Sequence, residues 1–188
     1  MLYLVRHGRT AANASGLLQG RLDPPLDEIG RKQAVAIANL VGPVDTVIAS
    51  SLVRAQETAE CFGLPVATDD RWIELAYGEY EGVPAAKVPD EVWHRWRTDG
   101  AFATEGGECF DALDSRVRAA CEELTDRIAS EDVVVVSHVS PIKAAVAWAL
   151  DASVEIMFHC HLSHASVCRV GIGKFGPILH TFNEQAAP

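Results

Sequence analysis

Two short runs without a charged residue constrain the fold of this chain more than any other feature. Residues 1–5 and 133–136 contain only aliphatic and aromatic side chains, with no alternation of polar and apolar positions. Such runs are typical of strands buried on both faces of a parallel sheet. Arg6-His7-Gly8 follows the first run and Ser137-His138 follows the second. Ligands of open α/β sheets bind at the carboxyl ends of strands, so these residues mark a candidate site.

The remaining elements are expected to alternate between strand and helix, which predicts an α/β class with a mostly parallel sheet. Asp27 is the expected N-cap of one helix and Ser51 of the next, while Ser140 would cap a third that has Pro141 at its first position. Gly8 is expected either to adopt a positive φ or to let a ligand approach the main chain. Strands are expected at residues 1–5, 44–49, 66–67, 133–136, 166–170 and 178–182, and helices at 27–40, 51–61, 90–97, 108–130 and 141–150.

Length and composition predict one domain over residues 1–188. The irregular segment at about 75–107, which carries Gly, Pro and Trp residues, is expected to be a lid-like insertion in it. A chain of 188 residues with 48% hydrophobic residues can bury a sizeable core. The net charge of −10 argues against non-specific nucleic-acid binding, although a local arginine cluster could still hold an anionic substrate. The apolar run 144–150 is shorter than the roughly 20 residues of a membrane span, and no signal peptide is apparent. We therefore expect a cytoplasmic protein. Its five cysteines are odd in number and form no Cys-x-x-Cys, so free buried thiols are expected.

Arg54 and His138 are candidates for binding an anion. With Ser51 as N-cap, Arg54 lies in the first helical turn, where a cation costs about 0.3–1 kcal/mol against the helix dipole. A bound phosphate would reverse that sign, because helix N-termini and arginine both favour anions. The alternatives are a solvated surface arginine and a purely structural histidine.

Glu74 is a candidate general acid because it lies between apolar neighbours. Glu79 and Glu81 follow in the same segment, and spacing alone does not choose among the three carboxyl groups. At least two of them are expected to be ordinary surface charges.

Taken in order, these residues resemble the histidine phosphatase superfamily, the phosphoglycerate mutase-like group (branch 1). The resemblance covers the chain from Arg6 to about Leu150 and implies a three-layer α/β/α fold with a mostly parallel mixed sheet. The matching motifs are Arg6-His7-Gly8-x-Thr10, Asn13, Gln19-Gly20, Ser51-x-x-Arg54-Ala55-x-x-Thr58-Ala59, Glu74 with Gly78 and Glu81-Gly82, Gly106-Gly107-Glu108, and Ser137-His138.

The resemblance also implies roles for these residues. His7 would attack phosphorus and form a phosphohistidine, and Glu74 would protonate the leaving oxygen and then activate water. No metal or other cofactor would be needed, because guanidinium groups stabilise the charge on the phosphoryl oxygens. The implied phosphate- and substrate-binding residues are Arg6, Thr10, Asn13, Gln19, Gly20, Arg54, His138 and Val139.

The chain departs from the usual family pattern at three positions. Val139 stands where glycine is common, Arg9 where an acidic or uncharged polar residue is frequent, and Glu105 where proline usually precedes Gly106-Gly107. None of these changes affects the expected nucleophile or acid.

Two further clusters each have a structural and a functional interpretation. His159 and His161 would share one face of a strand, with His164 nearby, so this cluster could bind a metal ion. The expected chemistry needs no metal, however, and His161 or His164 could instead border the substrate pocket. Trp93, Trp96, Tyr77 and Tyr80 could cover a sugar or base, but anchoring a short helix in the core is the favoured interpretation.

The expected function is metal-independent hydrolysis of a small phosphate monoester through a phosphohistidine. The alternatives are a phosphoglycerate mutase, whose family members are longer, and a non-catalytic protein that binds a phospholigand. The expected partner is a small phosphorylated metabolite rather than nucleic acid or a membrane, and a homodimer is compatible with the sequence. Substrate choice is expected to reside at 75–107 and 159–164.

Overall fold

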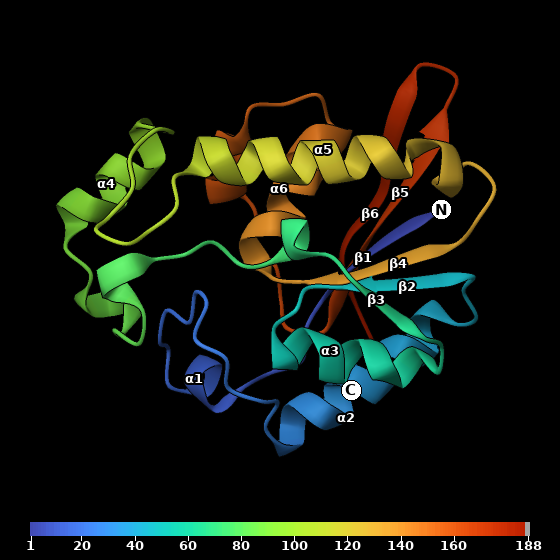
Figure 1. Cartoon of the computed structure of the whole chain (residues 1–188), viewed down its shortest axis with the longest axis horizontal. Helices are drawn as coiled ribbons and strands as arrows, with labels where there is room; N and C mark the ends of the chain where they lie inside the picture. The colour runs from blue at the N-terminus through green and yellow to red at the C-terminus, as the bar shows by residue number, and fades with distance from the viewer. Residues whose placement is uncertain (187–188) are drawn as a thin grey trace.

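A six-stranded mixed sheet organises the protein, whose structure is a computed structural model describing residues 1–186 (Figure 1). The strand order is β3-β2-β4-β1-β5-β6. The first four strands in this order are parallel, and β5 pairs antiparallel with both β1 and β6, so the predicted mostly parallel mixed sheet is confirmed. The strands are β1 (Leu2–Arg6), β2 (Thr46–Ala49), β3 (Val66–Thr68), β4 (Val133–Ser137), β5 (Ser166–Gly173) and β6 (Gly176–Gln185).

Helices cover both faces of the sheet, which confirms the three-layer α/β/α architecture. Helices α5 and α6 lie above the strands in Figure 1, and α2 and α3 lie below them. The α-helices are α1 (Ala11–Ala14), α2 (Glu28–Val41), α3 (Val53–Ala59), α4 (Asp90–Thr98), α5 (Phe110–Ile128) and α6 (Val139–Ala149), and the short 3-10 helices are Glu60–Phe62, Asp70–Trp72, Gly78–Tyr80, Ala85–Lys87 and Val154–His159.

The unbroken apolar runs are explained by two cores that share the same strands. Leu2 and Leu4 of β1 point into the core formed with α5 and α6. Tyr3 and Val5 point into the opposite core, with α2 and α3. The valines of β4 alternate in the same way. Because both faces are covered, neither strand needs a polar face.

The register of β1 and β4 brings the two motif histidines together. Arg6 is opposite Ser137 in this parallel pair, and the His7 amide donates to the Ser137 carbonyl at 3.0 Å. His7 and His138 therefore leave the sheet side by side at its carboxyl edge, as the strand ends predicted.

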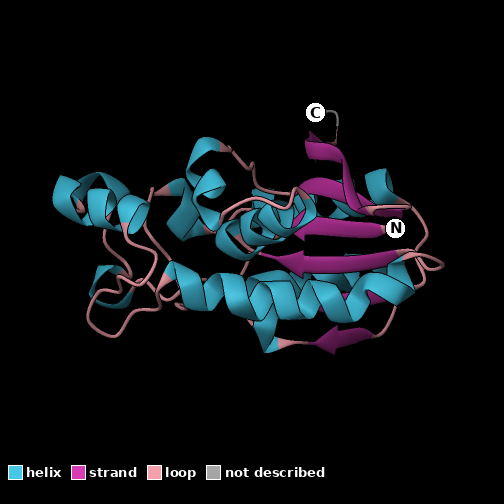
Figure 2. Cartoon of the chain, turned by 90° about the horizontal axis from the view of Figure 1, so that it is seen from above, coloured by secondary structure: helices cyan, strands magenta, loops and turns pink. Residues whose placement is uncertain are grey.

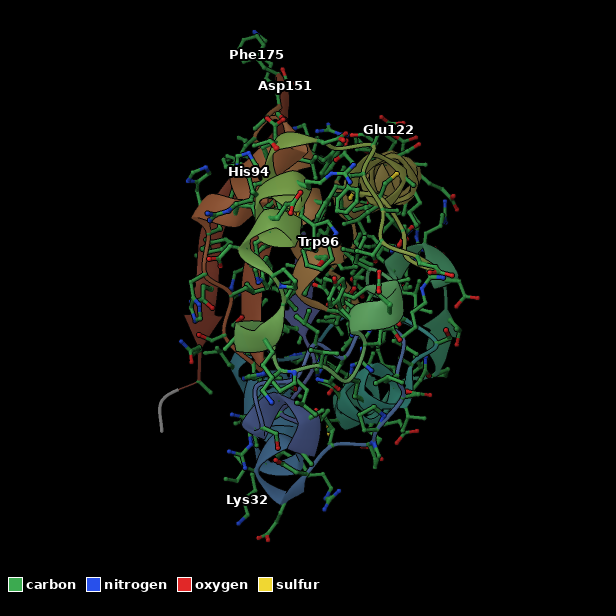
Figure 3. All side chains as sticks on the ribbon, turned by 90° about the vertical axis from the view of Figure 1, so that its left-hand side faces the viewer. Lys32, His94, Trp96, Glu122, Asp151 and Phe175 are labelled. Carbon is green, nitrogen blue, oxygen red and sulfur yellow. The ribbon has the colours of Figure 1, made fainter. Side chains whose placement is uncertain are left out.

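Residues 77–107 form one excursion at the end of the molecule opposite the β5–β6 hairpin (Figure 2). A bridge between Tyr77 and Gly107 joins its two ends. Its helix α4 is anchored by Trp96, which is buried and turned toward the body of the molecule, whereas His94 is exposed (Figure 3). The rings of Tyr77, Tyr80 and Trp93 surround Trp96 edge to face, so the interpretation of a core anchor holds for Trp96.

Two predicted helix starts are wrong, whereas Asp27 caps α2 as predicted, through the Gly30 amide at 2.7 Å. The N-cap of α3 is Leu52 rather than Ser51, so Arg54 is its second residue. The N-cap of α6 is His138 rather than Ser140, which places Pro141 third. Proline is tolerated there because the first amides of a helix have no partner within it.

The predicted strand at the histidine cluster is also wrong. His159 ends the 3-10 helix Val154–His159, and the residues up to Ser166 form no strand, so His159 and His161 do not share a strand face. Within residues 1–186, no three His, Cys, Asp or Glu side chains are grouped so as to hold a metal ion. No helix in this range is both long and apolar enough to cross a bilayer. All five cysteines are free, as predicted, but only Cys121 and Cys168 are buried as expected, whereas Cys61 is exposed.

Candidate active site

A cavity of about 190 Å³ opens at the carboxyl edge of β1 and is lined by most of the predicted site residues. Thr10 and His138 are the exceptions, since both are completely buried and neither is among the lining residues. The lining residues are Arg6, His7, Asn13, Leu17, Leu18, Gln19, Gly20, Arg54, Glu74, Tyr77 and Val139.

His7 is held as a neutral imidazole in one tautomer. Its Nδ1 lies 2.6 Å from the Gly8 carbonyl oxygen, which can only accept, so Nδ1 carries the proton. Nε2 accepts from Arg54 Nε at 3.3 Å and keeps its lone pair. Burial, followed by the charges of Arg54 and Arg6, lowers the pKa of His7 well below 6.5. The neutral ring can therefore act as a nucleophile through Nε2.

His138 is a second neutral imidazole beside the first. The two ring centroids are 5.0 Å apart. Nε2 of His138 is 2.8 Å from Ser50 Oγ, while its buried Nδ1 has no hydrogen-bond partner among the described residues. Burial, then Arg54, lowers the pKa of His138 well below 6.5. A buried polar atom without a partner is costly, which makes Nδ1 a candidate donor to a bound anion.

Two buried guanidinium groups supply the positive charge of the site. Arg54 donates from Nη1 to the Leu22 carbonyl at 2.7 Å and from Nη2 to the Gly20 carbonyl at 2.8 Å. Arg6 donates from Nη1 to the Leu162 carbonyl at 2.6 Å, and its buried Nε has no partner among the described residues. Burial lowers the pKa of Arg6 to about 10 and also lowers the pKa of Arg54. Arginine side chains keep their charge at neutral pH, so both groups are cations. Together they favour an anionic ligand.

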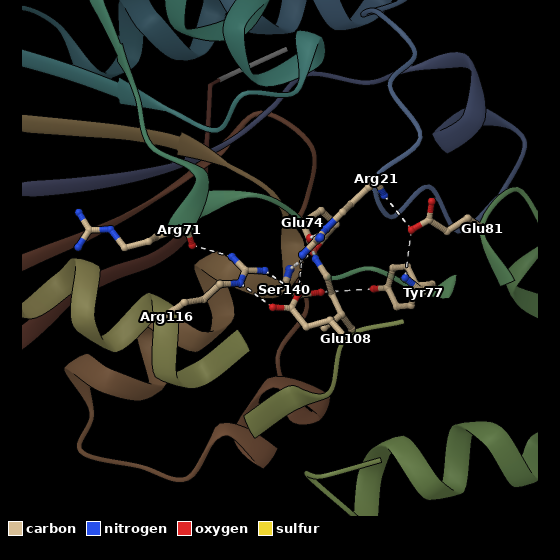
Figure 4. Close-up of polar contacts among 9 residues, drawn as sticks. Arg21, Arg71, Glu74, Tyr77, Glu81, Glu108, Arg116 and Ser140 are labelled. Carbon is tan, nitrogen blue, oxygen red and sulfur yellow. Dashed lines mark hydrogen bonds and ion pairs between the residues drawn. The ribbon is translucent and has the colours of Figure 1, made fainter. Parts of the chain in front are cut away.

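Glu74 is the carboxylate that enters the cavity (Figure 4). Its Oε1 accepts from the amides of Leu75 at 2.8 Å and Ser140 at 3.2 Å. Ser140 N is one of the amides at the start of α6 that has no partner within the helix. Glu79 is exposed, as expected for a surface charge. Glu81 is not a plain surface charge, because its Oε1 accepts from the amides of Arg21 and Tyr77.

Thr10 supports its neighbours rather than lining the cavity. It is the N-cap of α1, a short helix absent from the predicted elements, and forms a capping box with Asn13. Its Oγ1 also donates to Gln19 Oε1 at 3.0 Å. Because the oxygens of Asn13 and Gln19 are engaged with Thr10, their amide NH₂ groups are left to donate to a ligand.

The predicted positive φ at Gly8 is wrong, whereas Gly20 does require glycine. Gly8 has no positive φ; a Cβ there would instead collide with the Gly30 carbonyl oxygen. Gly20 has a φ of +53°, and a Cβ there would collide with the Glu81 carboxylate.

Several residues of the site are not predicted from the sequence. Ser50, whose Oγ lies 2.8 Å from His138 Nε2, is one of them. His164, predicted as a possible border of the pocket, does not line the cavity, although its ring centroid is 6.5 Å from that of His7. Tyr77 lines the cavity, and its hydroxyl lies 3.3 Å from Ser140 Oγ. The family motifs carry no signal for Ser50, and the sequence favours Tyr77 as a core residue because an aromatic stretch more often packs than binds.

Comparison with known proteins shows the family to which the chain belongs. A sequence model of the family described as "Histidine phosphatase superfamily (branch 1)" matches residues 2–185. The bifunctional protein Rv2228c of Mycobacterium tuberculosis (strain ATCC 25618 / H37Rv) is 35% identical over 176 residues, or 88% of this chain and 48% of that protein. The chain therefore spans about half the length of this relative.

Two other relatives are covered over most of their length. The probable phosphoglycerate mutase GpmB of Yersinia pestis (strain Pestoides F) is 33% identical over 180 residues, which is 90% of this chain and 83% of that protein. The structure of mycobacterial glucosyl-3-phosphoglycerate phosphatase Rv2419c with VO3 superposes with a TM-score of 0.86 at 29% identity, covering 98% of this chain and 99% of that one. This chain is a member of branch 1 of the histidine phosphatase superfamily, with a phosphoglycerate mutase-like fold.

Proposed function

We propose that the protein is a metal-independent phosphatase that hydrolyses a small phosphate monoester through a phosphohistidine at His7. The observation that carries this proposal is the unprotonated Nε2 of His7, which lines the cavity beside two arginines. Family membership supports a phosphatase or a mutase, and a neighbour named as a phosphatase supports hydrolysis.

Binding would begin with the donors that have no partner. Arg6 Nε and His138 Nδ1 are buried and unpaired among the described residues, and a phosphoryl group would supply their acceptors. Ser50 Oγ can donate its hydrogen to His138 Nε2, which leaves the ring proton on Nδ1. The charge of Arg54 and the amide groups of Asn13 and Gln19 would hold the remaining oxygens.

Phosphoryl transfer would proceed in two displacements. In the first, the lone pair of His7 Nε2 forms a bond to phosphorus, the P–O bond to the alcohol breaks, and the carboxyl form of Glu74 gives its proton to the leaving oxygen. In the second, water loses a proton to the Glu74 carboxylate and attacks phosphorus, which breaks the N–P bond and releases inorganic phosphate. The enzyme returns to its starting state, with the Glu74 proton restored.

The test is the replacement of the nucleophile. We expect His7→Ala to lower kcat/KM for ethyl phosphate at least about a thousandfold, because the covalent route is lost. His180→Ala removes an exposed imidazole on β6 and serves as the matched control, with no change expected. An acid-labile phosphoryl group on the His7 peptide of the wild-type enzyme would be the direct readout. Turnover that survives in His7→Ala would refute the proposal.

A mutase is the second candidate, favoured by the name of the Yersinia relative. The two reactions are separated by incubating the protein with 3-phosphoglycerate. A phosphatase releases inorganic phosphate, whereas a mutase yields 2-phosphoglycerate without it. Tight phosphate binding with neither product would identify a non-catalytic binding protein.

A further inference from the structure

A second pocket, of about 240 Å³, adjoins the catalytic cavity. The two share Tyr77 and Val139 as walls. We call this second space the aromatic pocket, because rings of Trp93, Trp96 and two phenylalanines line it with Tyr77. A group attached to a phosphate in the catalytic cavity could therefore extend past Tyr77 into it.

The aromatic pocket begins where the leaving group would depart. Ser140 lines this pocket, and its amide donates to Glu74 Oε1 at 3.2 Å (Figure 4). Ser140 Oγ lies 3.3 Å from the Tyr77 hydroxyl oxygen. Glu74 thus stands at the boundary between the two spaces. An alcohol oxygen protonated by Glu74 would carry its substituent into the aromatic pocket.

The rings of the pocket are held by one another and present fixed apolar surfaces. Trp93 and Trp96 pack edge to face with centroids 5.1 Å apart, and Phe110 and Phe158 do the same at 5.2 Å. Trp96 and Phe110 are buried, whereas Trp93 and Phe158 are half-buried and leave part of their surface to the pocket. Such surfaces favour a planar ring, because aromatic pairs gain more than area burial alone provides.

Among the described residues that line the pocket, Lys143 is the one with a charge, and none is a carboxylate. Its Nζ donates one hydrogen to the Met157 carbonyl at 2.9 Å. An ammonium group has three donors, and no second acceptor for this one lies within reach among the described residues. The Arg97 guanidinium, 5.5 Å from the centre of the Phe158 ring, adds a second positive charge nearby. The charges therefore suit an acceptor or anionic group on the ligand.

We propose that the aromatic pocket is the leaving-group subsite, and that the substrate is a phosphomonoester whose alcohol carries a planar aromatic ring with a carboxylate or similar acceptor for Lys143. This inference rests on the proposed phosphatase function and adds the class of substrate. It assigns Lys143 and Phe158 to substrate selection.

The test compares esters whose leaving alcohols are of similar basicity: ethyl, cyclohexylmethyl, benzyl and 4-carboxybenzyl phosphate. We expect kcat/KM for benzyl phosphate to exceed that for ethyl phosphate about ten- to a hundredfold, through burial of the ring. Cyclohexylmethyl phosphate should fall between them, because it is apolar but not planar. The 4-carboxy group should add about a further tenfold through Lys143.

Two variants, each with a matched control, assign the selectivity to the pocket. Lys143→Met should remove the advantage of 4-carboxybenzyl over benzyl phosphate, whereas Lys174→Met on the exposed hairpin should retain it. Phe158→Leu should lower the benzyl-to-ethyl ratio about threefold or more, whereas Phe175→Leu, at an exposed hairpin position, should leave it unchanged. Ratios within one variant are insensitive to the fraction of protein that is folded.

The outcomes separate this inference from the proposed function. If no ester is hydrolysed, or if His7→Ala hydrolyses them as well as the wild type, the proposed function fails. If ethyl phosphate is hydrolysed through His7 but benzyl phosphate has no advantage, the aromatic subsite is wrong and the phosphatase stands. A 4-carboxy advantage that survives in Lys143→Met would remove Lys143 from the proposal.

Discussion

Three histidines near the cavity have a lowered pKa, and burial is the largest cause of the shift in each of them. His7 and His138 have pKa values well below 6.5, and burial, followed by the charge of Arg6, lowers the pKa of His164 to about 4. The unfolded chain would instead take up these protons near the ordinary value of 6.5. A group whose pKa is lower in the folded state loses its stabilising contribution as pH falls below the unfolded value.

We therefore predict that the free energy of unfolding is greatest above about pH 6.5 and falls as pH is lowered from 6.5 toward 4. Urea unfolding at a series of pH values measures this. Carboxyl groups with a lowered pKa, such as Asp27, become protonated only below their ordinary value of 3.8. Their effect on the free energy of unfolding therefore falls below the pH range of this prediction. His164→Asn should make the fall shallower, since it removes one of the three groups. A free energy of unfolding that stays constant between pH 6.5 and 4 would contradict the prediction.

Among the elements, the end of β1 and the start of α2 meet through backbone alone. A Cβ on Gly8 would collide with the Gly30 carbonyl, and a Cβ on Gly30 would collide with the Arg9 carbonyl. Neither obstacle is a flexible side chain that could move aside. We predict that Gly8→Ala lowers the free energy of unfolding by about 1–3 kcal/mol, the usual cost of overpacking.

Denaturant unfolding of Gly8→Ala, beside wild type, measures this effect. Gly16→Ala is the comparison, because a Cβ there meets nothing within 4 Å and only the strain of its φ of +68° remains. That strain amounts to about 1 kcal/mol. Equal losses in the two variants would mean that crowding at Gly30 plays no part.

For the molecule as a whole, the sheet and the position of its site are set by local sequence. The runs that precede Arg6 and Ser137 have no polar face, which predicts that they are central strands of the sheet. They pair in parallel, so their carboxyl ends meet at the same edge. The helix starts beyond these strand ends are harder to predict. Ser51 and Ser140 are good capping residues, yet the N-caps are Leu52 and His138, neither of which caps with a side-chain hydrogen bond.

The long-range contacts of the site could not be derived from spacing. Thr10 bonds to Gln19 across a loop, and Gly8 meets Gly30 only after the chain has folded back. The aromatic pocket likewise needs α4, α5 and α6 in their final positions before its rings surround one space. Such contacts depend on packing between distant segments, which periodicity and propensity do not encode.

The ladder bond between the His7 amide and the Ser137 carbonyl has a consequence for hydrogen exchange. Because this amide continues the pairing of β1 with β4, it should open only when the central sheet opens. We predict that in native-state exchange the His7 amide is as protected as that of Val135, while the Asn13 amide in the four-residue α1 exchanges far sooner. Rapid exchange at His7 would contradict this. The backbone of the reacting residue would then open as rarely as the central sheet, whereas the backbone of α1 beside the cavity would open locally and more often.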